Sequence, residues 1–256
     1  MPIKINHKLQ PFTHLPGAEV VIPLTHWRVR IFPARLVFFQ EGADKEFSLL
    51  LHVQGPVKDF TVLLDLEKQR VVVLGQTKTG FLRYQIDAEK GLVFEKKPQG
   101  FLCEGTVPLI SAATFVKTGE RLFLGVTKKT DWTLLQRRCD TREFLPIWFF
   151  FGQQVPIVKK APICQLAAEK KFQEAFLAGF ANLFAPRLFD NDYQGIVATA
   201  KEGDSLSLLQ SGYAAIRSLF FLQEEAIFQI LPALPKELVQ GRLVNLHCAD
   251  LGTLHL

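Results

Sequence analysis

Alternation of apolar and polar residues over residues 19–126 constrains the fold of this chain more than any other feature. Within residues 27–32, for example, Trp27, Val29 and Ile31 are apolar while Arg28 and Arg30 fall between them. A period of two is typical of a strand with one buried face and one face in water. The other segments with this pattern, separated by turns that contain glycine, are residues 47–54, 60–66, 70–74, 81–86, 92–95, 114–117 and 121–126.

The spacing of these segments predicts an antiparallel β-sandwich. They recur about every ten residues with no helical pattern between them, whereas a parallel sheet needs a crossover helix after each strand. No GxGxxG or GxxxxGK[ST] motif follows any of the strands, so no nucleotide-binding loop is predicted. The clearest inward-facing set is Phe47, Leu49, Leu51, Val53, Phe60, Val62, Leu64 and Leu66.

The composition is that of a folded protein. The chain has 256 residues, of which 48% are hydrophobic and 21% charged, which suffices for one large domain or two small ones and excludes a disordered, collagen-like or coiled-coil chain. The four cysteines form no CxxC pair and the six histidines form no HxH, HxxH or HExxH motif, so neither a metal site nor a cofactor is predicted. Without a signal-peptide core or an unbroken apolar run of 18 residues, we expect a soluble, cytoplasmic protein that does not enter membranes.

The pattern changes to a helical one after Pro156. Apolar residues at steps of three and four predict helices over residues 163–184 and 205–222, the second beginning at the capping pair Asp204 and Ser205. Residues 144–151 (FLPIWFFF) are interpreted as a fully buried strand or as an inner edge strand that carries Pro146. Further strands are predicted over residues 226–230, 242–247 and 251–256.

The predicted fold is therefore mainly β with α. Residues 1–156 form an N-terminal antiparallel β-sandwich, and residues 157–256 form a two-helix connection with a short C-terminal β element. Whether these parts make one domain or two, and what the oligomeric state is, are left open.

A basic cluster is the first candidate binding feature. Residues 117–142 hold seven basic side chains against three acidic ones, which accounts for four of the five net positive charges. Arg137 and Arg138 can bind an anion through their guanidinium groups, and Trp132 can stack on a sugar or a base. The alternative is a solvated surface on which the arginines pair with Asp131 or Asp140. Nothing resembles a nucleic-acid module, so nucleic acid is not favoured.

A second candidate lies in residues 185–203, a long connection between the two predicted helices. On extended chain Asp190 and Asp192 emerge on the same side, where one carboxylate can raise the pKa of the other and retain a proton for acid or base catalysis. The alternative is turn chemistry, since Asp and Asn close local hydrogen bonds in loops. Calcium binding lacks the later glutamate of an EF-hand.

Residues 230–236 (ILPALPK), followed by Gly241 and residues 244–246, resemble a stretch of the inverting α-L-fucosidase family of glycoside hydrolases. In that family LPALP leads from a helical barrel into a C-terminal β-sandwich. Residues 182–184 (NLF) are similar to the family's sequence upstream, and Asp192 falls at its catalytic base when one residue is deleted. The resemblance covers about 65 residues, and the barrel that carries the general acid is absent.

The resemblance implies a reduced relative of a carbohydrate-active enzyme that binds a glycan or an anionic sugar and does not hydrolyse it, since inversion needs two placed carboxyl groups. The alternative is a structural or protein-interaction scaffold without a small-molecule ligand. The candidate catalytic residues are Asp192 and Asp190, and the candidate substrate-binding residues are Trp132, Arg137, Arg138 and Tyr193.

Overall fold

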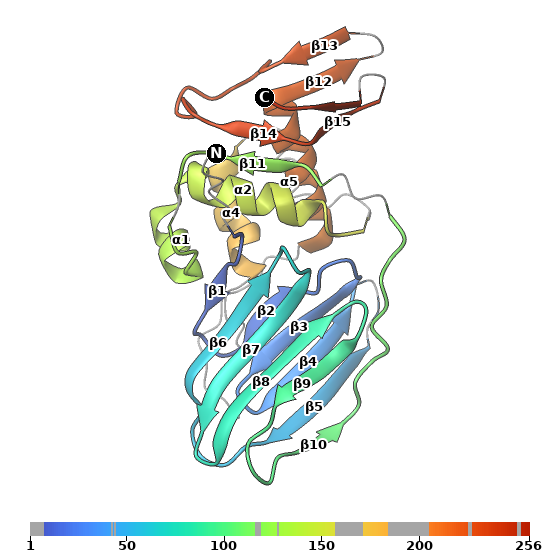
Figure 1. The fold of residues 1–256 in the computed structure, drawn as a ribbon, viewed down its shortest axis with the longest axis vertical. Helices are drawn as coiled ribbons and strands as arrows, with labels where there is room; N and C mark the ends of the chain where they lie inside the picture. Colours follow the sequence, from blue (N-terminus) through green and yellow to red (C-terminus); the bar gives the residue numbers. More distant parts are fainter. Residues whose placement is uncertain are drawn as a thin grey trace, which may run out of the picture.

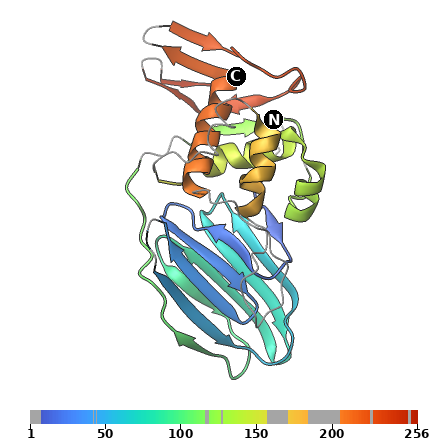
Figure 2. The same cartoon turned by 180° about the vertical axis from the view of Figure 1, so that it is seen from behind.

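A computed structural model of the chain describes residues 8–41, 43, 45–115, 119–126, 128–156, 171–183, 205–224, 227–249 and 252–256. The fold is mainly β with α, as predicted, and it has three tiers along its long axis (Figure 1). A β-sandwich forms one end, a layer of helices covers the end of the sandwich, and a group of short two-stranded ribbons lies beyond the helices (Figure 2).

The sandwich consists of two five-stranded sheets in which every neighbouring pair of strands is antiparallel. Most neighbours are also consecutive in sequence, so the sheets grow by hairpins. One sheet has the order β1 (Phe12–Thr13), β6 (Lys58–Asp65), β7 (Arg70–Thr77), β8 (Gly80–Asp87), β9 (Gly91–Lys96). The other has the order β10 (Leu102–Gly105), β5 (Glu46–His52), β4 (Arg35–Gln40), β3 (Trp27–Phe32), β2 (Ala18–Val21).

The period of two correctly predicted the buried faces of β3, β5 and β6, whereas β1, β4 and β10 were not predicted. Along β3 the burial alternates until Phe32, with Val29 and Ile31 fully buried. One predicted strand was wrong: Thr114 and Phe115 lie in no strand, and residues 116–118 fall outside the described residues. Of the predicted inward set, Leu49, Leu51, Phe60, Val62, Leu64 and Leu66 are buried, and Phe47 and Val53 are partly buried against the same core.

The helical layer comprises α1 (Trp132–Arg138), α2 (Thr141–Gly152), α4 (Phe172–Ala178), the 3-10 helix η1 (Phe180–Leu183) and α5 (Ser205–Phe220). The prediction of the second long helix is confirmed by α5. Of the other predicted helix, the described part is α4 followed by η1, with the break at Gly179. Since α1 and α2 precede Pro156 and pack in this same layer, the helical layer begins well before the predicted connection.

The interpretation of residues 144–151 as a strand was wrong, because they form most of α2. An unbroken apolar run has no period, and Pro146 favoured a strand edge. Residues 143–152 are all buried, and the helix packs against α5 and β11. A helix surrounded by protein is apolar on every side, so residues 144–151 contain no polar residue that would mark a solvent-facing side.

Two glycines let α2 and α5 approach closely. A Cβ atom on Gly212 would overlap the indole of Trp148, and one on Gly152 would overlap the backbone of Leu209. At this crossing the Trp148 Nε1 donates a hydrogen bond to the Leu208 carbonyl oxygen at 3.2 Å. The absence of side chains at two positions therefore determines how these helices pack.

Aromatic rings fill the space between α1, α2, α4 and η1. Phe144 and Phe176 stack with centroids 4.2 Å apart, and Trp148 and Phe180 stack at 4.8 Å. Trp132 meets Phe180 edge to face at 5.4 Å. This aromatic cluster belongs to the same continuous core as the sandwich interior.

Three two-stranded antiparallel ribbons form the far tier. They pair β11 (Arg121–Phe123) with β14 (Arg242–Val244), β12 (Phe221–Glu224) with β13 (Ile227–Ile230), and β15 (Leu246–Cys248) with β16 (Gly252–Leu254). The predicted C-terminal β element is therefore present, although residues 242–247 are divided between two ribbons.

Candidate functional site

Trp132 is a core residue in the structure. Its side chain is 2% exposed, lies edge to face against Phe176 and Phe180, and donates from Nε1 to the Ala181 carbonyl oxygen at 2.8 Å. The indole thus fastens α1 to η1 and has no free face for a ligand. Asp190, Asp192 and Tyr193 lie outside the described residues.

Arg137 and Arg138 lie at the opposite end of α1 from Trp132, so the structure does not bring them together with the indole. The prediction that Arg138 pairs with Asp131 or Asp140 was wrong. Arg138 binds the carboxylate of Glu143, with Nη2 to Oε2 at 2.5 Å. Asp131 instead caps α1 by accepting from the Thr133 and Leu134 amides.

We call the exposed group Lys128, Lys129, Arg137, Arg138 and Arg142 the basic surface. Much of its charge is balanced locally. Lys128 joins Arg138 on Glu143, and Arg142 binds Asp140 at 2.8 Å. Among the described residues, Lys129 and Arg137 have no acidic partner.

The carboxylates beneath the basic surface are held in their charged forms. Burial opposes ionisation of Glu143, but hydrogen bonds from Arg138 and Lys128 outweigh it and hold the pKa of this carboxyl below its usual value. The hydrogen bond from Arg142 likewise lowers the pKa of Asp140. Both carboxylates thus stay charged at neutral pH and neutralise part of the basic surface.

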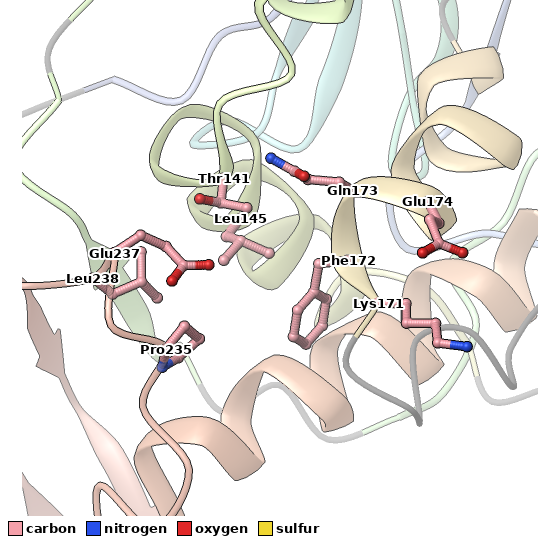
Figure 3. Close-up of a pocket in the computed structure, with 9 residues that line it drawn as sticks. All are labelled: Thr141, Leu145, Lys171, Phe172, Gln173, Glu174, Pro235, Glu237 and Leu238. Atoms are coloured by element: carbon pink, nitrogen blue, oxygen red, sulfur yellow. The ribbon is translucent and has the colours of Figure 1, made fainter.

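A pocket of about 170 Å³ lies between the first turns of α2 and α4 and the loop that follows β13 (Figure 3). The helix α2 starts here because the Asp140 side chain accepts from the Arg142 amide at 2.9 Å. The loop is shaped by the Leu238 amide, which donates to the Pro235 carbonyl oxygen at 3.0 Å. The lining residues are Thr141, Leu145, Lys171, Phe172, Gln173, Glu174, Pro235, Glu237 and Leu238.

This pocket combines an apolar floor with a polar rim. Leu145, Phe172 and Leu238 are each at most 5% exposed and form the floor. Figure 3 shows the Glu237 carboxylate turned toward Leu145 and the Gln173 amide turned toward Thr141. The floor can cover the apolar face of a ligand while the rim accepts and donates hydrogen bonds.

The pocket adjoins the basic surface. The Gln173 Nε2 donates to the Cys139 carbonyl oxygen at 3.3 Å, directly after Arg138, and Thr141 in the pocket wall precedes Arg142. The pocket and the basic surface therefore meet at the turn between α1 and α2.

Glu120 is the most deeply buried carboxylate among the described residues, and it serves the fold. It is 0% exposed and accepts from Arg217, from the Tyr213 hydroxyl at 3.0 Å and from the His247 amide at 3.0 Å. Gln153 bonds to both its backbone N–H and its carbonyl oxygen. With every partner supplied by the protein, Glu120 joins α2 and α5 to the ribbon β15–β16.

The sequence analysis missed the polar rim of the pocket, Thr141, Gln173 and Glu237. The LPALP segment contributes Pro235 to the wall, so the resemblance did direct attention to this loop. The start of α2 also carried a signal, since Asp140 followed by Glu143 has the spacing of a capping box.

No helix in the described part of the chain is long and apolar enough to cross a membrane. Within the same residues, no group of three or more His, Cys, Asp or Glu side chains is arranged to hold a metal ion. Comparison of the chain with protein-family models, with curated proteins and with solved structures finds no match.

Proposed function

We propose that the protein binds a glycan, without hydrolysing it, in the pocket between α2, α4 and the loop after β13. The observation that carries this proposal is the buried apolar floor beneath a rim of hydroxyl, amide and carboxylate groups. A sugar ring has the matching character, with C–H groups on its faces and hydroxyls around its edge. The resemblance of residues 230–236 to a glycoside hydrolase family supports the same ligand class.

The dimensions favour a single sugar ring at the end of a glycan. The volume of about 170 Å³ is below the ~300 to 1,000 Å³ typical of sites that enclose a drug-sized ligand. Glu237 can accept hydrogen bonds from sugar hydroxyls, and bonds to a charged acceptor are stronger than neutral ones. An acidic substituent on the same glycan would be attracted by the positive charge of Arg137, so the test includes both neutral and anionic sugars.

The test is a glycan array followed by titration calorimetry on each hit. Replacing Gln173 and Glu237 together by Ala should abolish binding, because the exposed rim supplies the polar contacts. Glu89→Ala, an exposed glutamate on the β8–β9 turn, is the matched control and should bind normally. Binding that survives the rim variant would overturn the proposed site.

The contribution of the basic surface has its own test. Arg137→Ala should weaken binding of acidic glycans only, and added salt should weaken it further because exposed charges are screened. An aryl-glycoside panel should show no turnover. Hydrolysis that depends on Asp192 would refute the non-hydrolytic part of the proposal.

A second function, a protein-interaction scaffold, is favoured by an apolar hollow of about 200 Å³ on the other side of Leu238. Leu234 and Val239 at its rim are 36% and 83% exposed, and Phe220 and Leu243 form its base. An array without hits, together with capture of a partner that Val239→Glu abolishes, would favour the scaffold over the glycan.

A further inference from the structure

We propose that β13 is the interface through which two copies of this chain pair, edge to edge, into a symmetric dimer. The strand lies at the end of the molecule farthest from the sandwich and is the outermost strand of the ribbons (Figure 1). Among the described residues it is paired with β12 alone. This proposal does not depend on glycan binding, and none of the strand's own residues, 227–230, lines the pocket or the hollow.

The sequence of β13 lacks the usual protection of an edge strand. Natural edges carry lysine, proline or a bulge that prevents pairing with another chain. The strand's residues 227–230 read Ile-Phe-Gln-Ile, with no charge, proline or glycine, and Pro232 follows outside the strand. Ile227 is 64% exposed and Ile230 is 58% exposed, so apolar side chains on both faces of the ribbon are open to solvent.

The hydrogen-bond pattern shows which backbone groups point outward. The Leu231 amide donates to the Phe220 carbonyl oxygen at 2.8 Å, and the register pairs Phe221 with Ile230. Because hydrogen-bonded and non-hydrogen-bonded pairs alternate in an antiparallel ladder, Gln229 also bonds to β12. The N–H and C=O groups of Phe228 and Ile230 therefore face the open edge.

This pattern selects one register for an antiparallel pair of β13 strands. The register in which both outward-facing residues of each strand are bonded pairs Phe228 with the partner's Ile230 and Ile230 with the partner's Phe228, which places the two-fold axis at Gln229. Residues that lie opposite each other on the two β13 strands then have their side chains on the same face of the sheet, as antiparallel pairing requires. A contact that reproduces itself under a two-fold axis closes the dimer and leaves no free edge at the interface.

The side chains suit this register. Phe228 lies opposite the partner's Ile230, which is 58% exposed before pairing. Leu231 follows the strand with a φ of 53° and lies beyond the paired residues. Gln229 lies opposite the partner's Gln229, where two amides can bond to each other. Pairing covers exposed apolar residues, brings no like charges together, and extends a two-stranded ribbon, which is marginal alone, to four strands.

Sedimentation velocity of the full chain over a wide range of concentration tests the proposal. One strand pair buries little area, so the wild type should form a dimer that dissociates on dilution. Gln229→Lys places two lysines opposite each other and should weaken the dimer by about tenfold or more. Gln99→Lys, an exposed glutamine on the sandwich, should leave it unchanged.

A disulfide experiment tests the register itself. At a non-hydrogen-bonded pair the Cα atoms lie about 4.5 Å apart, within the range that a disulfide spans. In a Cys103→Ser background, Gln229→Cys should cross-link into a covalent dimer under copper–phenanthroline oxidation, and Gln99→Cys should not. A wild type that stays monomeric, a dimer that Gln229→Lys does not weaken, or an uncross-linked Gln229→Cys would each overturn the proposal.

Discussion

The sandwich and the helical layer bury their cores by different means. Inside the sandwich the side chains are mostly aliphatic and repeat at every second position, as Val29, Ile31, Val62 and Leu64 do. In the helical layer the core is aromatic, and its rings meet at defined stacked or edge-to-face angles. Both indole N–H groups in this layer, those of Trp132 and Trp148, are hydrogen-bonded to carbonyl oxygens.

This difference bears on how each region specifies its structure. Aliphatic residues of similar volume can replace one another in a sheet core with a modest loss in the free energy of unfolding, because the core needs only apolar side chains of the right size at alternate positions. Aromatic clusters depend on ring orientation and on hydrogen bonds to the indole groups. We therefore expect substitutions to cost more in the helical layer than in the sandwich.

The largest expected effect is that of Phe180→Ala. Phe180 is 1% exposed and contacts both Trp132 and Trp148, so its loss should lower the free energy of unfolding by about 3 to 5 kcal/mol. Urea unfolding measures the change. Phe38→Ala in the sandwich removes the same atoms from a side chain that is 0% exposed; as the matched comparison it should cost about 3 kcal/mol, the lower end of this range. Equal losses at the two sites would contradict the contrast between the regions.

The next effect concerns the buried carboxylate at the junction of the helical layer and the ribbons. Glu120→Gln keeps the shape but removes the charge that Arg217 and Tyr213 contact, and should cost about 1.5 to 3 kcal/mol. Glu67→Gln, in a partly exposed pair with Arg121, should cost at most about 1 kcal/mol. Thermal unfolding of both variants gives the comparison, and a larger loss for Glu67→Gln would show that burial is not the deciding factor.

Gly212→Ala tests the close crossing of α2 and α5. Alanine favours a helix, yet its Cβ would overlap the Trp148 indole, so the variant should lose about 1 to 3 kcal/mol. Ala214→Gly, on the exposed side of α5, is the comparison. That change should cost about 1 kcal/mol through helix propensity alone. A stabilised Gly212→Ala would mean that the helices are not fixed by this contact.

The smallest effect has the opposite sign and lies in the sandwich. Tyr84 is 0% exposed, and its hydroxyl has no hydrogen-bond partner in the part of the chain that the structure describes. Tyr84→Phe should therefore raise the free energy of unfolding by about 1 kcal/mol. Tyr213→Phe is the control, because it removes a bond to Glu120 and should destabilise.

The same tyrosine gives the stability a dependence on pH. Burial raises the pKa of Tyr84 well above its usual value, so only the unfolded chain ionises this group near pH 10. The stability from this group is present below pH 10 and is lost as the pH rises further. Between pH 9 and 11 the wild type should lose about 1.4 kcal/mol more than Tyr84→Phe. Parallel losses in the two proteins would show that Tyr84 ionises in the folded state.

The sequence analysis succeeded where the pattern that indicates an element lies within a few consecutive residues, and it failed where the structure depends on distant segments. Strand β3 and the inward set around Leu49 and Val62 were predicted because a half-buried strand shows its period within a few residues. Helix α2 was misread because burial on all sides removes the period, although the capping signal at Asp140 was present. The pocket could not be predicted, since its walls come from three segments, around Thr141, Gln173 and Glu237, that are far apart in the chain.

By itself the sequence determined the sandwich, the helix α5 and the existence of a C-terminal β element, because hydrophobic period and turn residues act over short distances. The tertiary structure decided what individual side chains do. Trp132 became a core residue because α4 and η1 close over it, and Arg138 turned to Glu143 because the next helix places that carboxylate beside it. Such roles depend on which distant segments meet, and no pattern within one segment records that.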